Sequence, residues 1–106
     1  MKILFLGDIV GPSGCMVVEK YLKKIVEENK INFVIANGEN AAHNGVGITK
    51  DVLENLIKFG VNVLTTGNHV WDHKETLKLV EDDNRLLRPF NLIGTSPGKG
   101  FEIYKT

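Results

Sequence analysis

Three short polar clusters, each at the end of an apolar run, hold the residues of this chain that could do chemistry. The clusters are Gly7-Asp8, Asn37-Gly38-Glu39-Asn40 and Gly67-Asn68-His69. The apolar runs before them are residues 3–6, 33–36 and 61–64. Carboxylates, carboxamides and imidazoles are all ligands of divalent metal ions. The clusters therefore raise the hypothesis of a metal site assembled from three strand ends.

Alternating strands and helices are the elements expected to position these clusters. Apolar periodicity predicts strands at 2–6, 32–36 and 61–66, and helices at 14–29, from Thr49 to Gly60, and at 73–81. This order predicts an α/β fold with a parallel sheet and right-handed crossovers. The carboxyl ends of parallel strands share one edge, where ligands bind in such sheets. We therefore expect the three clusters to meet at that edge.

The pattern is weaker after Pro89. Residues 90–93 are interpreted as a short strand, and residues 101–104 as the beginning of another. Residues 95–100 between them are interpreted as a turn or loop. The glycine-rich stretch 94–100 does not fit a phosphate-binding loop, because its glycine spacing is one residue short and no Ser or Thr follows Lys99.

Composition limits the class of protein. The 106 residues fit one small domain, and 13 basic and 13 acidic residues give a formal charge of zero. That balance favours neither an extended nucleic-acid surface nor a membrane partner. Cys15 is the only cysteine, so no intrachain disulfide can form, and no run approaches the ~20 apolar residues of a membrane span. We therefore expect a cytoplasmic protein.

Two of the polar clusters also have a structural alternative when each is taken alone. Asp8 could brace a turn, and Asn68 and His69 could stabilise a turn and pack at a strand end. Glu39 is harder to explain in this way, because a partly desolvated carboxylate requires a compensating charge. A metal ion would supply that charge. The coincidence of three such strand ends favours the metal site.

Longer motifs around the clusters resemble those of a known family. The motifs are GDIVG (7–11), NGENAA (37–42), GVGIT (45–49) and TGNHVWD (66–72). They resemble the bacterial metallophosphoesterases of the 2′,3′-cyclic-nucleotide 2′-phosphodiesterase type, the YmdB-like family of the calcineurin-like phosphoesterase superfamily. The resemblance extends over essentially all 106 residues.

This resemblance implies a fold, a set of ligands and a reaction. The fold is the N-terminal βαβαβα half of a metallophosphoesterase α/β/β/α sandwich, with residues 1–106 as a single domain that lacks the C-terminal half. Of two divalent ions (Fe, Mn or Zn), one would be bound by Asp8 and Asn40 and the other by Asn68, with Glu39 bridging them. A metal-bound hydroxide would hydrolyse a cyclic nucleotide or related phosphodiester, and His69 would be the general acid.

Two departures from the family pattern bear on activity. Cys15 stands where an arginine is usual, and we interpret its thiol as a packing group rather than a nucleophile. The family's further histidine ligands lie on later loops, and we interpret His43 and His73 as solvent-facing or as supporting residues rather than as their replacements.

We therefore expect this chain to bind metal weakly unless another chain completes the site. The alternative function is that of a catalytically incompetent half-domain that acts as an assembly or binding module. Such a module would self-associate or bind a complementing chain through an exposed sheet edge after Tyr104.

Overall fold

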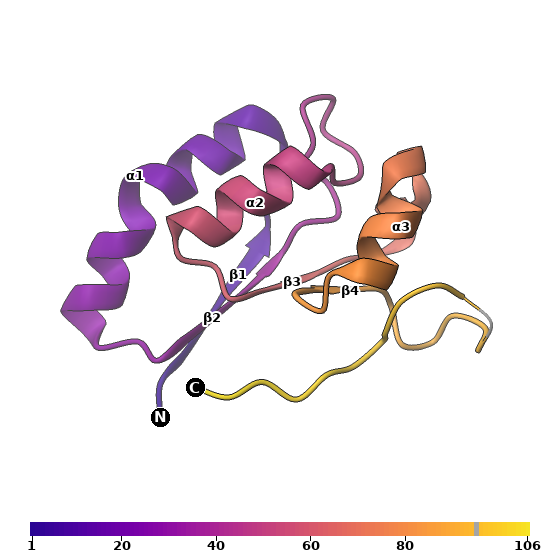
Figure 1. Cartoon of the computed structure of the whole chain (residues 1–106). Helices are drawn as coiled ribbons and strands as arrows, with labels where there is room; N and C mark the ends of the chain where they lie inside the picture. Colours follow the sequence, from indigo (N-terminus) through magenta and orange to yellow (C-terminus); the bar gives the residue numbers. More distant parts are fainter. Residues whose placement is uncertain (95) are drawn as a thin grey trace.

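The computed structural model, which describes residues 1–94 and 96–106, contains a four-stranded parallel sheet (Figure 1). The strands are β1 (Ile3–Asp8), β2 (Phe33–Asn37), β3 (Val63–Thr65) and β4 (Leu86–Leu87). They lie in the order β1-β2-β3-β4, and every neighbouring pair is parallel. The predicted α/β class and parallel sheet are therefore confirmed.

The helices connect the strands much as the sequence predicts. They are α1 (Gly11–Asn29), α2 (Lys50–Phe59) and α3 (Lys74–Asp82). The caps predicted for α2 are present: the Thr49 side chain accepts a hydrogen bond from the Val52 amide at 3.5 Å, and Gly60 closes the helix with φ 119°. These caps fix both ends of the crossover between β2 and β3.

Helices α1 and α2 cover one face of the sheet, and the core lies between these helices and the sheet (Figure 1). Alternate residues of β2 point into it, so Val34 and Ala36 are buried. They belong to one cluster with buried leucines of the helices and of β3, namely Leu22, Leu53, Leu56 and Leu64. This packing fixes the strand register and therefore the positions at which the strands end.

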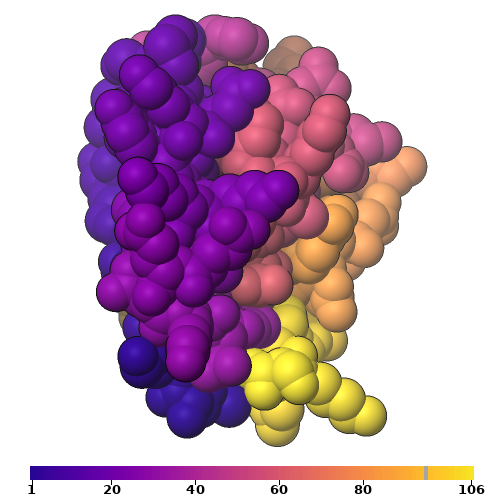
Figure 2. Space-filling model, turned by 90° about the vertical axis from the view of Figure 1, so that its left-hand side faces the viewer, coloured from indigo at the N-terminus to yellow at the C-terminus, as the bar shows by residue number. Residues whose placement is uncertain are grey.

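The opposite face of the sheet is only partly covered. Ile3 and Phe5 of β1 remain 57% and 58% exposed. The C-terminal residues lie on this side: the Tyr104 ring packs against Phe33 with ring centroids 5.8 Å apart, and its hydroxyl donates to the carbonyl of Asn84. Figure 2 shows the C-terminal residues in yellow beside the N-terminal residues in indigo.

Two of the predicted strands are wrong. Residues 90–93 form turns in which Phe90 and Ile93 are 72% and 76% exposed, and residues 101–106 contain no strand. The sheet edge expected after Tyr104 is therefore absent. The fourth strand is instead Leu86–Leu87, and a 3-10 helix, η1 (Asn68–Trp71), precedes α3.

The loop predicted over 95–100 is confirmed for residues 96–100, and Thr95 lies outside the described residues. Across the part of the chain that the structure describes, no helix is long and apolar enough to cross a membrane.

Candidate active site

The carboxyl ends of β1, β2 and β3 lie side by side, as predicted. Asp8 is opposite Asn37 across β1 and β2, and Asn37 is opposite Thr65 across β2 and β3. The backbone continues this alignment beyond the strands, because the Gly38 amide donates to the Thr65 carbonyl at 2.8 Å. The polar clusters therefore leave the sheet from adjacent positions at one edge, which we call the strand-end site (residues 7–8, 37–40 and 67–69).

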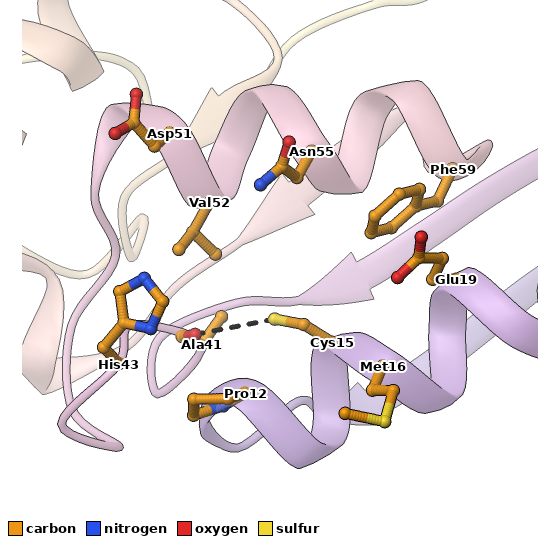
Figure 3. A pocket seen from close by; sticks show the side chains of 10 residues that line it. All are labelled: Pro12, Cys15, Met16, Glu19, Ala41, His43, Asp51, Val52, Asn55 and Phe59. Atoms are coloured by element: carbon orange, nitrogen blue, oxygen red, sulfur yellow. Dashed lines mark hydrogen bonds between the residues drawn. The ribbon is translucent and has the colours of Figure 1, made fainter.

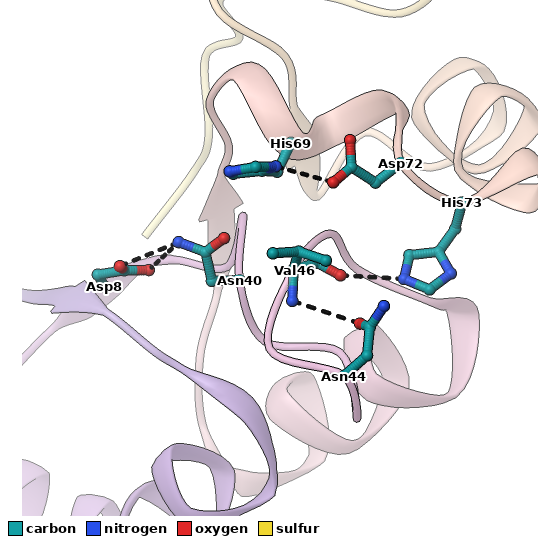
Figure 4. A network of polar contacts seen from close by, with 7 residues as sticks. All are labelled: Asp8, Asn40, Asn44, Val46, His69, Asp72 and His73. Atoms are coloured by element: carbon teal, nitrogen blue, oxygen red, sulfur yellow. Dashed lines mark hydrogen bonds and ion pairs between the residues drawn. The ribbon is translucent and has the colours of Figure 1, made fainter.

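Asp8 and Asn40 form the first direct contact within the strand-end site (Figure 4). The Asn40 amide Nδ2 donates to both carboxylate oxygens of Asp8, at 3.1 and 3.0 Å. Backbone contacts hold the two loops together here, since the Gly11 amide donates to the Asn40 carbonyl at 2.9 Å. Rotation of the carboxamide exchanges Oδ1 for Nδ2, so the same side chain can present an oxygen to a cation beside Asp8.

The Glu39 carboxylate lies directly against Gly67. A Cβ atom added to Gly67 would overlap both carboxylate oxygens, so this position has room for glycine alone while Glu39 keeps its place. The Glu39 backbone is fixed by two bonds: its amide donates to Asn37 Oδ1 at 3.2 Å, and its carbonyl accepts from the Gly47 amide at 2.6 Å. Gly67 therefore brings Glu39 next to the start of η1, where Asn68 lies.

His69 lies in η1 and is held by a residue that sequence reasoning missed. Its Nδ1 is 2.8 Å from Oδ2 of Asp72, three residues later in the chain (Figure 4). In a 3-10 turn, residues three apart lie above one another, which explains the contact. The sequence signal was available, because Asp72 closes the same TGNHVWD motif.

The other two histidines lie outside the strand-end site. His73 precedes α3, and its Nε2 is 3.0 Å from the Val46 carbonyl oxygen, so it supports the 43–47 loop. His43 is exposed and lines a separate pocket between α1 and α2. These placements fit the interpretation of His43 as solvent-facing and of His73 as a supporting residue.

The pocket between α1 and α2 has a volume of about 210 Å³ and a mostly apolar lining (Figure 3). The Cys15 thiol lies in it and donates to the Ala41 carbonyl at an S···O distance of 3.6 Å. Burial raises the pKa of this thiol, so a smaller fraction of it is nucleophilic thiolate. These contacts fit the interpretation of Cys15 as a packing residue.

The chemistry of the strand-end site fits a hard divalent cation in part. Carboxylate and carboxamide oxygens are suitable donors, and the Glu39 carboxylate lies against Gly67, the residue before Asn68. Within residues 1–94 and 96–106, however, no three His, Cys, Asp or Glu side chains gather so that they could hold an ion by themselves. Asp8 and Glu39 would need the carboxamides, water or further ligands to complete a coordination shell.

Residues 4–106 match the model of a protein family described as YmdB-like protein. The chain belongs to this family. It is 44% identical over 105 residues to the 2′,3′-cyclic-nucleotide 2′-phosphodiesterase of Bacillus subtilis (strain 168), a match that covers 99% of this chain and 39% of the relative.

Two crystal structures have the same fold at substantial identity. A hypothetical protein from Thermus thermophilus superposes with a TM-score of 0.91 at 39% identity, covering 100% of this chain and 40% of the other. A phosphatase from Mycoplasma pneumoniae gives a TM-score of 0.87 at 34% identity, covering 98% and 39%. The chain thus spans about two-fifths of the length of these relatives. Their names support a phosphoesterase family, in agreement with the motifs.

Proposed function

We propose that the strand-end site is part of the active site of a cytoplasmic, metal-dependent phosphodiesterase that acts on a cyclic nucleotide or a related phosphodiester. The observation that carries this proposal is the placement of the Glu39 carboxylate against Gly67, beside Asn68, while Asn40 contacts Asp8 along the same edge. These residues leave the sheet at one edge, with Glu39 against the residue before Asn68, and the name of the Bacillus relative supports the class of substrate.

Each residue then has a role. Asp8 and Asn40 would hold one divalent ion (Fe, Mn or Zn), Asn68 would hold a second, and Glu39 would bridge the two. Bound divalent ions would supply Lewis-acid chemistry at the phosphoryl group. Water would supply the attacking oxygen, which forms a new P–O bond and releases a proton to solvent. His69 would act as general acid: its Nε2–H bond breaks as the proton passes to the leaving oxygen, and the P–O bond to that oxygen breaks in the same step.

Metal binding and hydrolysis by the purified chain test this proposal. The metal-free chain is titrated with Mn²⁺, Fe²⁺ and Zn²⁺ by calorimetry, and hydrolysis of a 2′,3′-cyclic nucleotide and of bis(p-nitrophenyl) phosphate is then measured. We expect weak binding that falls by roughly tenfold or more in Glu39→Gln, because the bridging charge is lost. Equal metal affinity in the wild type and Glu39→Gln would contradict the assignment, as would hydrolysis that does not depend on added metal.

A second candidate, an assembly module, is favoured by the incompletely covered face of the sheet. Ile3 and Phe5 are more than half exposed there, and in the described chain β1 pairs with β2 alone, which leaves its outer edge open. Exposed apolar surface next to an open edge is a common site of association. A second copy of the chain or a complementing chain would cover both features.

Sedimentation velocity tests the assembly module. This candidate predicts a concentration-dependent dimer that Phe5→Lys disrupts, whereas Lys23→Glu, on the exposed side of α1, leaves it intact. A chain that remains monomeric at all concentrations and binds no partner would contradict it.

A further inference from the structure

We propose that Asp72 is a positioning residue that fixes which ring nitrogen of His69 faces the strand-end site. The use of this arrangement in catalysis rests on the phosphodiesterase function proposed above. The arrangement itself rests on the contacts of His69 and can be tested without any activity.

The hydrogen bond between the two side chains determines the tautomer of the ring. A carboxylate only accepts hydrogen bonds, so the 2.8 Å contact with Asp72 Oδ2 requires His69 Nδ1 to carry a hydrogen. In the neutral ring, the other nitrogen, Nε2, then has a free lone pair. Figure 4 shows that this nitrogen is directed away from Asp72, to the side on which Asp8 and Asn40 lie.

The backbone on both sides of this hydrogen bond is well anchored. In η1 the Val70 amide donates to the Gly67 carbonyl, and the Asp72 amide donates to the His69 carbonyl, both at 3.1 Å. The Val70 side chain is fully buried, so η1 is fixed to the core at the residue next to His69. One turn of well-anchored backbone therefore holds His69 and Asp72 at a constant separation.

The 43–47 loop supports Asp72 from the other side. A Cβ atom on Gly47 would collide with the His73 ring and would come within 3.3 Å of the Asp72 Cβ. The Val46 carbonyl in the same loop lies 3.0 Å from His73 Nε2. Loop and η1 therefore pack closely, and this packing restricts the rotamers available to Asp72.

The His69–Asp72 pair is suited to orienting a ring rather than to stabilising the fold. Both side chains are 37% exposed, and pairs of this exposure contribute little to the free energy of unfolding. When the imidazolium gives its Nε2 proton to the leaving oxygen, the product is the neutral ring with hydrogen on Nδ1. That is the tautomer that Asp72 accepts from, so the ring keeps its orientation, and a proton taken up from water at Nε2 restores the acid.

The direct test is the tautomer of each histidine by long-range ¹H–¹⁵N correlation on the ¹⁵N-labelled chain at about pH 8, where an ordinary imidazole is neutral. We expect the Nδ1–H form for His69. His73 provides an internal reference with the opposite tautomer, because its Nε2 faces a carbonyl oxygen and must carry the hydrogen. An Nε2–H signal for His69 in the wild type would overturn the proposal even if no variant folds.

Asp72→Ala is the matched variant, since it keeps the Cβ that packs near Gly47 and removes the carboxylate alone. We expect His69 to shift to a mainly Nε2–H population and His73 to stay unchanged. Asp82→Ala, which removes an exposed carboxylate at the end of α3, should change neither ring. A His69 tautomer that persists in Asp72→Ala would overturn the proposal.

The effect of Asp72 on catalysis is measured by comparing substrates whose leaving groups differ in their need for a proton. General acids contribute about 10²–10⁴-fold where the leaving oxygen needs a proton. Asp72→Ala should therefore lower kcat by about tenfold or more for an alkyl phosphodiester, and much less for a p-nitrophenyl ester, with metal uptake unchanged. An equal loss on both substrates would overturn the positioning role. Absence of hydrolysis by the wild type would instead count against the proposed function. The tautomer measurement would still test whether Asp72 positions His69.

Discussion

The strand-end site and the pocket between α1 and α2 contain similar side chains but differ in how these are arranged. In the pocket, His43, Asp51 and Glu19 lie around an apolar lining with Cys15 (Figure 3). At the strand ends the polar side chains contact one another instead, Asn40 with Asp8 and His69 with Asp72, and the Glu39 carboxylate lies against the Gly67 backbone. The contacts among polar groups at the strand ends are the reason for placing the proposed reactive region there rather than in the pocket.

Gly67→Ala should produce the largest difference between the two regions. The new Cβ would displace the Glu39 carboxylate, which is the end of a flexible side chain and can move at little cost in stability. Because Glu39 is the proposed bridge, we expect affinity for both ions to fall by about a hundredfold, measured by calorimetry, with little change in thermal midpoint.

Gly7→Ala is the control for Gly67→Ala, because a Cβ at Gly7 has no atom within 4 Å in the described part of the chain. Retention of metal affinity in Gly67→Ala would show that the placement of Glu39 is unimportant.

A matched pair of carboxylate variants should give the next largest difference. Asp8→Asn removes a ligand proposed for one ion only, so a loss of about tenfold in metal affinity is expected. Asp51→Asn removes a carboxylate from the α1–α2 pocket and should leave metal affinity unchanged. Calorimetric titration of both proteins with Mn²⁺ makes the comparison, and a larger effect of Asp51→Asn would reverse the assignment of the two regions.

The smallest expected effect concerns the reactivity of the pocket thiol. Burial raises the pKa of Cys15, so at a given pH near neutrality less thiolate is present than in an unfolded chain. Alkylation by iodoacetamide should therefore be several-fold slower in the folded protein than in urea, and the rate should keep rising at pH values above the ordinary thiol pKa. Faster alkylation in the folded chain would mean that the pocket activates the thiol.

The elements that position the strand-end site were predictable because their signals are local and repeated. Thr49 and Gly60 mark the ends of α2 by side-chain capping and by positive φ, and the apolar runs mark β1 to β3. Leu86–Leu87 was not predictable as β4, because a two-residue strand has no periodicity and depends on pairing with β3.

Within the site, residue types were predictable but contacts were not. Gly67 was noted only as part of its cluster, and only the folded chain shows that the Glu39 carboxylate occupies the space that a side chain at this position would fill. Asp72 was noted only as part of a motif, because its hydrogen bond to His69 requires the 3-10 turn of η1. Contacts across the sheet edge depend on register, which the sequence indicates only indirectly.

The measurement that tests the metal-site assignment most directly is paramagnetic broadening of the ¹⁵N-labelled chain by substoichiometric Mn²⁺. We expect the backbone amides of Asp8, Glu39, Asn40, Asn68 and His69 to broaden first, while those of Cys15, Asp51 and Asn55 in the α1–α2 pocket stay sharp. Broadening that begins in the pocket, or that is uniform over the chain, would contradict the assignment of the strand ends as the metal site.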